Sequence, residues 1–263
     1  MRNPRLAVAL IVLAVASRVH ASEEAASTFV KAIIPTLPVQ QEPCRDSFEG
    51  AGSGSVLICA RPTGDFEAFR QAWDLGVSGG EKVPAVAKPM TEWVTGVGGR
   101  MRWYALGDKW IVVTYDTTDR RVVISYPKDK EGVLPLARDI TPPRRITVED
   151  SSGEMRRRAR MGLSPETHGI VVMSAVIHKD GKIGDAEVLG CLPRHRGLEQ
   201  AALNAVKSWR YEPATKDGVP VNVSMTSSFT YGPGGFVRTS EGSDTKDIEG
   251  GGTSPKGGGG ADR

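Results

Sequence analysis

Cys191, His178 and His195 are the residues whose side-chain chemistry stands out in this 263-residue sequence. A thiolate together with imidazole nitrogens is a ligand set that zinc and copper ions accept. The spacing of the three residues matches no metal-binding motif, and a loop thiol with two surface histidines is the simpler interpretation. A metal-binding or enzymatic protein is therefore kept as an alternative, and no resident metal is expected.

Other patterns that could support catalysis are weak. Residues 50–55 read Gly-Ala-Gly-Ser-Gly-Ser, but this loop precedes a predicted strand and lacks the lysine of a phosphate-binding loop. No HExxH, GxSxG or paired-carboxylate arrangement stands out. We therefore predict that the protein is not an enzyme, that it has no catalytic residues and that it needs no cofactor.

Residues 1–21 have the organisation of a cleavable signal peptide. Arg2 and Arg5 precede an uncharged apolar run over residues 6–16, and cleavage is expected before Ser22. The apolar run is too short to cross a hydrocarbon core of roughly 30 Å as a helix. The sequence thus predicts export to the periplasm, with a retained inner-membrane anchor as the alternative.

Export changes the charge of the protein. The full chain has a formal net charge of +3, and the predicted signal peptide contains Arg2, Arg5 and Arg18 without an acidic residue. Removing it leaves a mature net charge of zero. Such a chain has no long-range attraction for a polyanion, so no nucleic-acid partner is expected.

Three cysteines are consistent with one disulfide in an oxidising compartment. Cys44 and Cys59 lie close together in sequence and are the predicted pair, which leaves Cys191 as a free thiol.

Composition divides the mature chain into four parts. Residues 22–128 are predicted to form an α+β domain whose function the sequence does not indicate. Residues 129–166 are predicted to form a charged linker containing Pro142 and Pro143. The arginines near the end of this linker are interpreted as a solvated face. Residues 167–232 form a second domain, and the glycine-rich residues 233–263 are predicted to be a disordered tail.

Within the first domain, helices are predicted near residues 25–34 and 63–74, the second one capped by Thr63. A strand is predicted over residues 55–60. Three more strands, separated by short turns, are expected to form an antiparallel meander over residues 100–106, 109–115 and 120–126.

The second domain has the clearest pattern. Strands are predicted over residues 169–178 and 183–189, joined by an Asp180-Gly181 turn. An apolar stripe at helical spacing runs from Leu198 to Trp209, and strict alternation marks a long strand over residues 221–231. The expected fold is α+β, with one helix packed on a three-stranded antiparallel sheet in two layers, and such a sheet leaves two edges.

Residues 169–231 resemble the C-terminal domain of the TonB energy-transducer family. The matching positions follow the family's order: Gly169 before a hydrophobic strand, Asp180-Gly181, Ala201-Ala202-Leu203, Trp209-Arg210-Tyr211 with Pro213-Ala214, Asp217-Gly218-Val219-Pro220, and the final alternating strand.

The resemblance implies a periplasmic domain that binds an extended segment of an outer-membrane transporter by adding it to the sheet as a further strand. It implies that the last strand is the docking edge, and the predicted partner-binding residues are Val221, Val223, Met225, Ser227, Phe229 and Tyr231. The exposed edges also permit a homodimer.

The chain departs from a full transducer in lacking a long proline-rich spacer and an evident N-terminal membrane helix, the part that contacts the ExbB and ExbD proteins. Partner recognition is therefore predicted ahead of energy transduction. A membrane-anchored transducer subunit is the alternative.

Overall fold

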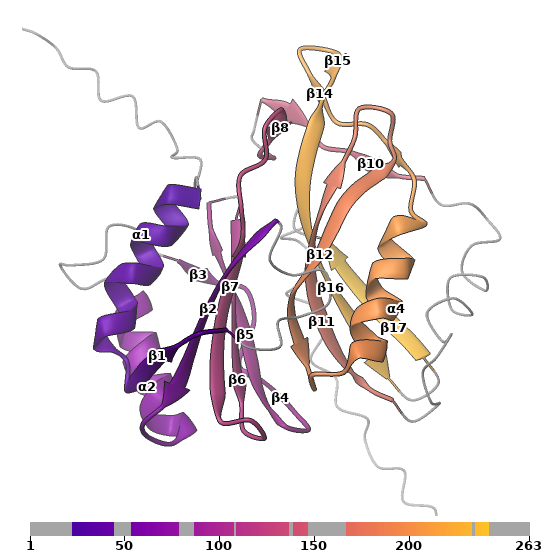
Figure 1. The fold of residues 1–263 in the computed structure, drawn as a ribbon. Coiled ribbons are helices and arrows are strands. Elements are labelled where there is room, and N and C mark those ends of the chain that lie inside the picture. The colour runs from indigo at the N-terminus through magenta and orange to yellow at the C-terminus, as the bar shows by residue number, and fades with distance from the viewer. Residues whose placement is uncertain are drawn as a thin grey trace, which may run out of the picture.

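The computed structural model describes residues 23–44, 54–78, 87–107, 109–136, 139–146, 167–232 and 235–241, the last of these as backbone only. The described elements form four layers (Figure 1). Helices α1 (Glu23–Ile33) and α2 (Phe66–Val77) cover one sheet, a second sheet lies against its other face, and α4 (Arg196–Lys207) covers the far side of the second sheet.

The first sheet contains seven described strands in the order β1-β2-β7-β6-β5-β3, with β4 also paired to β5. All these pairings are antiparallel, and β5, β6 and β7 form the predicted meander. The strand bounds are β1 (Val39–Glu42), β2 (Ser55–Pro62), β3 (Lys88–Pro89), β4 (Val94–Gly96), β5 (Gly99–Leu106), β6 (Lys109–Asp116) and β7 (Arg121–Pro127).

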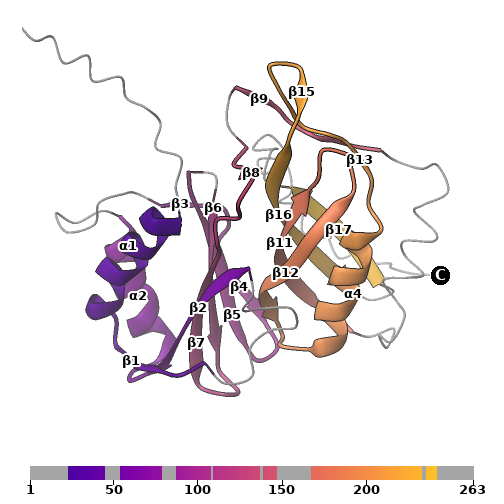
Figure 2. The same ribbon diagram turned by 45° about the horizontal axis from the view of Figure 1, so that its top comes forward.

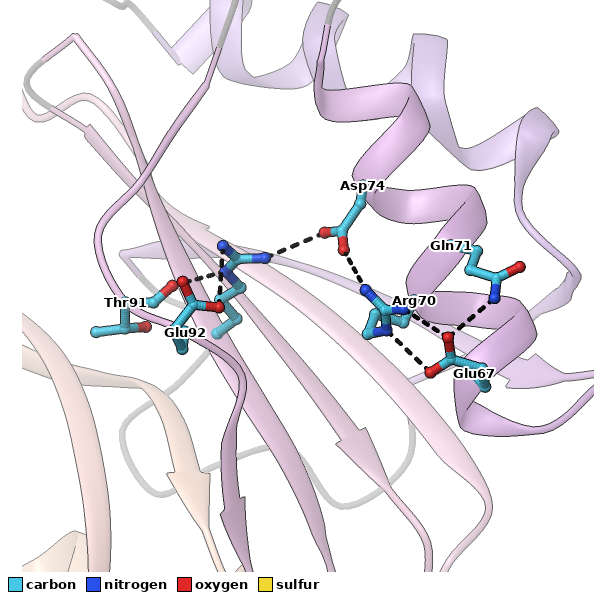
Figure 3. Close-up of polar contacts among 7 residues, drawn as sticks. Glu67, Arg70, Gln71, Asp74, Thr91 and Glu92 are labelled. Carbon is cyan, nitrogen blue, oxygen red and sulfur yellow. Dashed lines mark hydrogen bonds and ion pairs between the residues drawn. The ribbon is translucent and has the colours of Figure 1, made fainter.

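Helix α2 is fixed to this sheet by both apolar and polar contacts. Phe69 and Trp73 are fully buried on its sheet-facing side. On its flank, the Asp74 carboxylate accepts hydrogen bonds from Arg70 of the same helix and from Arg102 of β5, each 3.1 Å long (Figure 3). The prediction of Thr63 as the cap is wrong, because the Asp65 carboxylate accepts the Ala68 N–H at 2.9 Å.

The second sheet contains five described strands in the order β12-β11-β16-β17, with β8 also paired to β16. Their bounds are β8 (Val133–Leu134), β11 (Gly169–Ile177), β12 (Ile183–Leu192), β16 (Asn222–Gly232) and β17 (Gly235–Glu241). The predicted three strands are β11, β12 and β16. The prediction of a three-stranded sheet is wrong because β8 comes from the predicted linker and β17 from the predicted disordered tail.

More of the predicted linker pairs with the second half of the chain. Strand β9 (Ile140–Thr141) pairs with β14 (Thr215–Lys216), which also pairs with β15 (Val219–Pro220). Strand β10 (Arg144–Arg145) pairs with β13 (Tyr211–Glu212). Residues 139–146 therefore run along this half as ordered strands, as Figure 2 shows.

The two sheets share an apolar interface. Val112 of β6 and Met101 of β5 lie in one buried cluster with Val172 of β11 and with Leu189 and Leu192 of β12. Other members of the cluster are the stacked Trp103 and Trp110, whose ring centroids are 6.3 Å apart. The prediction of a separate first domain is not confirmed, because both halves bury side chains against each other.

Cys44 and Cys59 form a disulfide that ties the segment after β1 to β2, while Cys191 is a buried free thiol. The predicted signal peptide, the loop at residues 50–53, most of the arginine run and the chain after residue 241 lie outside the described residues. None of the described helices is long and apolar enough to cross a membrane.

Candidate partner-binding edge

Strand β16 is the long alternating strand that the sequence predicts, and it pairs antiparallel with β11 from Gly169↔Tyr231 to Ile177↔Val223 without a register break. Such a strand has two backbone sides. One side is consumed by β11, and the other side, which we call the outer side of β16, is available to further strands.

Five of the six predicted site residues lie on one face of β16 and Val221 directly precedes the strand, but their side chains belong to the core. Val223 and Phe229 are fully buried, and Met225 and Tyr231 are nearly so, while Ser227 is buried among them and Val221 packs partly buried against the same core. They fix β16 in place, and any docking there must use the backbone.

The Trp209-Arg210-Tyr211 junction after α4 packs against the core-facing side of β16. The Trp209 ring stacks on Phe229 with centroids 5.3 Å apart, and the Tyr211 hydroxyl lies 3.5 Å from the Met225 sulfur. The Arg145 guanidinium sits 4.7 Å from the centre of the Trp209 ring. Trp209, the last residue of the predicted apolar stripe, is thus buried in the core.

The outer side of β16 is occupied by the chain itself. Strand β8 pairs in parallel with Asn222 and Val223, and β17 pairs antiparallel from Ser227 to Gly232. The prediction that residues 221–231 form a sheet edge is therefore wrong over these two stretches. The side-chain alternation could not show this, because strand pairing uses backbone groups that every residue carries.

The opposite strand of this sheet, β12, is covered in a different way. Among the described strands it pairs only with β11, but its second half lies against the first sheet. The Ser125 hydroxyl of β7 donates a hydrogen bond to the backbone carbonyl of Leu189. The first sheet thus lies against this part of β12, which leaves no room there for a docking strand.

Glu187 of β12 is a buried carboxylate between the sheets. It is 3% exposed, and its Oε1 lies 3.9 Å from Lys130 Nζ. Burial raises the pKa of Glu187, because desolvation of the charged form outweighs the favourable effects of Ser55 and of the two nearby lysines, Lys130 and Lys128.

Comparison with known protein families gives one match. Residues 160–233 match the family model of the Gram-negative bacterial TonB protein C-terminal. These residues are therefore similar to a TonB C-terminal domain. The domain includes β11, β12, α4 and β16, so the resemblance stated from the sequence is confirmed, and it points to a protein of the Gram-negative envelope. No curated protein and no solved structure gives a significant match to the chain.

The sequence analysis missed the two strands that pair with the outer side of β16. Strand β8 is two residues long and has no periodicity that could predict it. Strand β17 had a readable signal: Gly-Pro-Gly-Gly at residues 232–235 is typical of a turn, and Phe236-Val237 follows it directly. In the structure, β17 begins at Gly235, two residues after the end of the family match.

The residues of the metal-binding alternative have other roles. The Cys191 thiol lies 3.1 Å from the Pro193 carbonyl oxygen, and burial raises its pKa to about 12, so it stays protonated at neutral pH. His195 caps α4 by accepting the Leu198 N–H at its Nδ1 atom, 3.4 Å away. Within the described ranges, no group of three metal-ligating side chains lies close enough to hold an ion.

Proposed function

We propose that this protein is a non-enzymatic periplasmic binding protein whose TonB C-terminal domain receives an extended segment of an outer-membrane transporter as an added strand. The docking site is the outer side of β16. The observation that carries the proposal is that β16 is a continuous eleven-residue strand, Asn222–Gly232, whose apolar side chains are fixed in the core while the backbone of its outer side pairs with other strands.

The packing beneath β16 supports this role. Phe229 rests on Trp209, Met225 on Tyr211, and Tyr211 donates its N–H to the Gly181 carbonyl at 2.9 Å. A strand held on a rigid support presents its backbone groups in a fixed line, so a partner loses less conformational freedom when it binds. Affinity would come from main-chain hydrogen bonds, and specificity from the side chains that flank the strand.

Proline scanning of β16 tests the proposal. Successive residues of a strand direct their N–H groups to opposite sides, so Ser227→Pro and Ser228→Pro remove bonds to opposite neighbours. One of these two proline variants removes an N–H that bonds to β11, which destabilises the core. The other, the outer-side proline variant, removes an N–H on the outer side of β16. Ser227→Ala and Ser228→Ala are the matched controls, since they shorten the side chain and keep the N–H.

The readout is capture of detergent-solubilised outer-membrane proteins by the immobilised full chain, followed by binding of a synthetic peptide from the periplasmic end of the captured transporter. The outer-side proline variant should remain folded and lose this binding, while both alanine variants retain it. Undiminished peptide binding by a folded outer-side proline variant would refute docking at β16.

A further inference from the structure

We propose that β17 is an internal occupant of the docking site, which an incoming partner strand displaces from β16. This inference rests on the proposed function, because it concerns the regulation of the same site. In this inference, residues 235–241 compete with the partner strand for pairing with the outer side of β16.

The pairing of β17 covers the backbone groups that docking requires. Its register runs from Ser227↔Glu241 to Gly232↔Gly235, so it lies beside six consecutive residues of β16. The two strands leave a two-residue connection, as in a hairpin. A partner strand cannot bond to these groups while β17 is present, because each N–H and C=O serves one ladder at a time.

The pairing of β17 is less regular than the pairing on the other side of β16. Its register shifts between Thr230 and Tyr231, where Val237 is the extra residue of a bulge. By contrast, β11 pairs with β16 over nine residues without a shift. Among the described elements, β17 packs extensively against β16 alone. A bulged strand with one main neighbour opens at lower free energy than a strand inside the sheet.

Among the described residues, the outer side of β16 also has a stretch without a paired strand, which we call the gap and where exchange can begin. Strand β8 ends its pairing at Val223, and β17 begins its pairing at Ser227. No described strand pairs with Ser224, Met225 or Thr226 on this side. The gap adjoins Glu241, at the end of β17 remote from the hairpin connection. An incoming strand can therefore pair first in the gap and then replace β17 from the Glu241 end toward Gly235.

The amino-acid composition of β17 is consistent with a strand that a partner can displace. Gly-Phe-Val-Arg-Thr-Ser-Glu contains two apolar side chains in seven residues, whereas β11 reads Gly-Ile-Val-Val-Met-Ser-Ala-Val-Ile. A strand with few apolar residues gains little net stability from its backbone pairing, because ordering entropy offsets most of the hydrogen-bond gain. The apparent affinity for a partner then falls by the fraction of molecules in which β17 is displaced.

Three forms of the protein test this inference: the native chain, a chain that ends at Gly232, and a locked chain with Ser228→Cys and Ser240→Cys. These two serines are direct cross-strand partners in the register, so the new cysteines can form a bond between β16 and β17. The single variant Ser228→Cys is the control for the locked chain. Circular dichroism and mass spectrometry verify folding and the new disulfide.

The probe is a fluorescent synthetic peptide with the sequence of residues 233–241. The shortened chain should bind it about three- to fivefold more tightly than the native chain, because its site is never self-occupied. The locked chain should not bind, and reduction should restore binding to the level of the equally reduced Ser228→Cys control. Equal affinity of the native, shortened and locked chains would overturn the inference, as would a folded shortened chain that does not bind.

Amide hydrogen exchange of the native chain gives a measurement without any variant. We expect β17 amides to exchange at least about tenfold faster than those of β11, as a strand that opens locally does. Equal protection of both strands would overturn the inference.

Outer-membrane capture separates this inference from the proposed function. If the peptide binds as expected but none of the three forms captures a transporter, the proposed function fails and self-occupation stands. If all three capture a transporter equally, the binding function stands and the displacement of β17 is wrong.

Discussion

The two ends of the second sheet are closed by different kinds of contact. At the β12 end, Leu189, Gly190 and Leu192 lie against Val112 and Met101 of the first sheet. At the β16 end, the outer side bonds to β8 and β17 through the backbone. Side-chain packing requires a particular complementary surface, whereas backbone pairing accepts any extended chain. The same sheet thus has one end that is closed by side-chain packing and one end that is covered by backbone pairing, where we propose that the neighbouring strand is exchanged.

This difference has an energetic basis. Buried apolar surface contributes roughly 25 cal/mol per Å², and no solvent interaction replaces it when the surface is exposed. A backbone hydrogen bond contributes only about 0.5–1.5 kcal/mol net, because water or another strand can replace the partner. We therefore expect variants at the β12 end to change global stability and variants at the β17 end to change binding.

The largest expected effect is that of Leu189→Ala at the interface between the sheets. Leu189 is fully buried there, and loss of its side chain removes contacts from both sheets. The free energy of unfolding should fall by about 2–5 kcal/mol, measured by urea denaturation. Leu75→Ala on α2 is the matched control, because Leu75 is 75% exposed and its loss should change stability by less than about 0.5 kcal/mol. Equal effects of the two substitutions would contradict a packed interface.

A smaller loss is expected when a methyl group is added to Gly190. A Cβ atom there would lie 2.7 Å from a Val112 methyl carbon and 3.0 Å from the Met101 sulfur, so the sheets must separate slightly. Gly190→Ala should lower the free energy of unfolding by roughly 1–3 kcal/mol. In Gly64→Ala the new Cβ atom meets Ala68 at an ordinary 3.4 Å, so that control should be close to neutral. A near-neutral Gly190→Ala would show that the sheets do not pack as closely as described.

The sequence predicted the elements that carry their own periodicity. The alternation along β16 and the apolar stripe of α4 each specify which side chains are buried, and Trp209 was correctly expected in the core. The docking of the two sheets has no such local signature. One signal of this docking was present in the sequence, because residues 188–192 read Val-Leu-Gly-Cys-Leu without a polar residue. In the structure this run is buried throughout, as is every residue of β6. A continuous apolar run is typical of a strand covered on both faces.

The occupant of the candidate site could not be predicted in the same way. Strand β8 pairs through two residues, and β17 bonds through its backbone, so neither pairing leaves a pattern in side-chain type. The match to the TonB C-terminal family ends at residue 233, immediately before β17. Family resemblance therefore suggested β16 as the docking strand and gave no information about the segment that pairs with it.

Glu187 gives the interface between the sheets a pH dependence. Its pKa is raised in the folded protein, so the neutral form is favoured there, and this contribution to stability is full below the unfolded-state pKa. It is lost as the pH rises through the folded-state pKa. Glu187→Gln should therefore be more stable than the native chain at neutral pH, by roughly 1 kcal/mol, and should lose the decline that the native chain shows above pH 4.5.

The control for Glu187→Gln is Asp185→Asn on the same strand, whose side chain is 82% exposed. Thermal unfolding across pH 4 to 8 should leave this variant parallel to the native curve. Parallel curves for Glu187→Gln and the native chain would show that the carboxyl group is not buried between the sheets.

The smallest effect on stability is expected when β17 is removed. Ending the chain at Gly232 deletes the pairs from Ser227↔Glu241 to Gly232↔Gly235 and leaves the β11–β16 ladder and the Trp209–Phe229 stack intact. Each lost hydrogen bond contributes about 0.5–1.5 kcal/mol, but ordering each residue of β17 costs about 1–2 kcal/mol, so the terms nearly cancel. The free energy of unfolding should change by less than about 1 kcal/mol, measured by urea denaturation beside Leu189→Ala. A loss as large as that of Leu189→Ala would mean that β17 is an integral strand of the sheet, and the two ends would then be closed equally firmly.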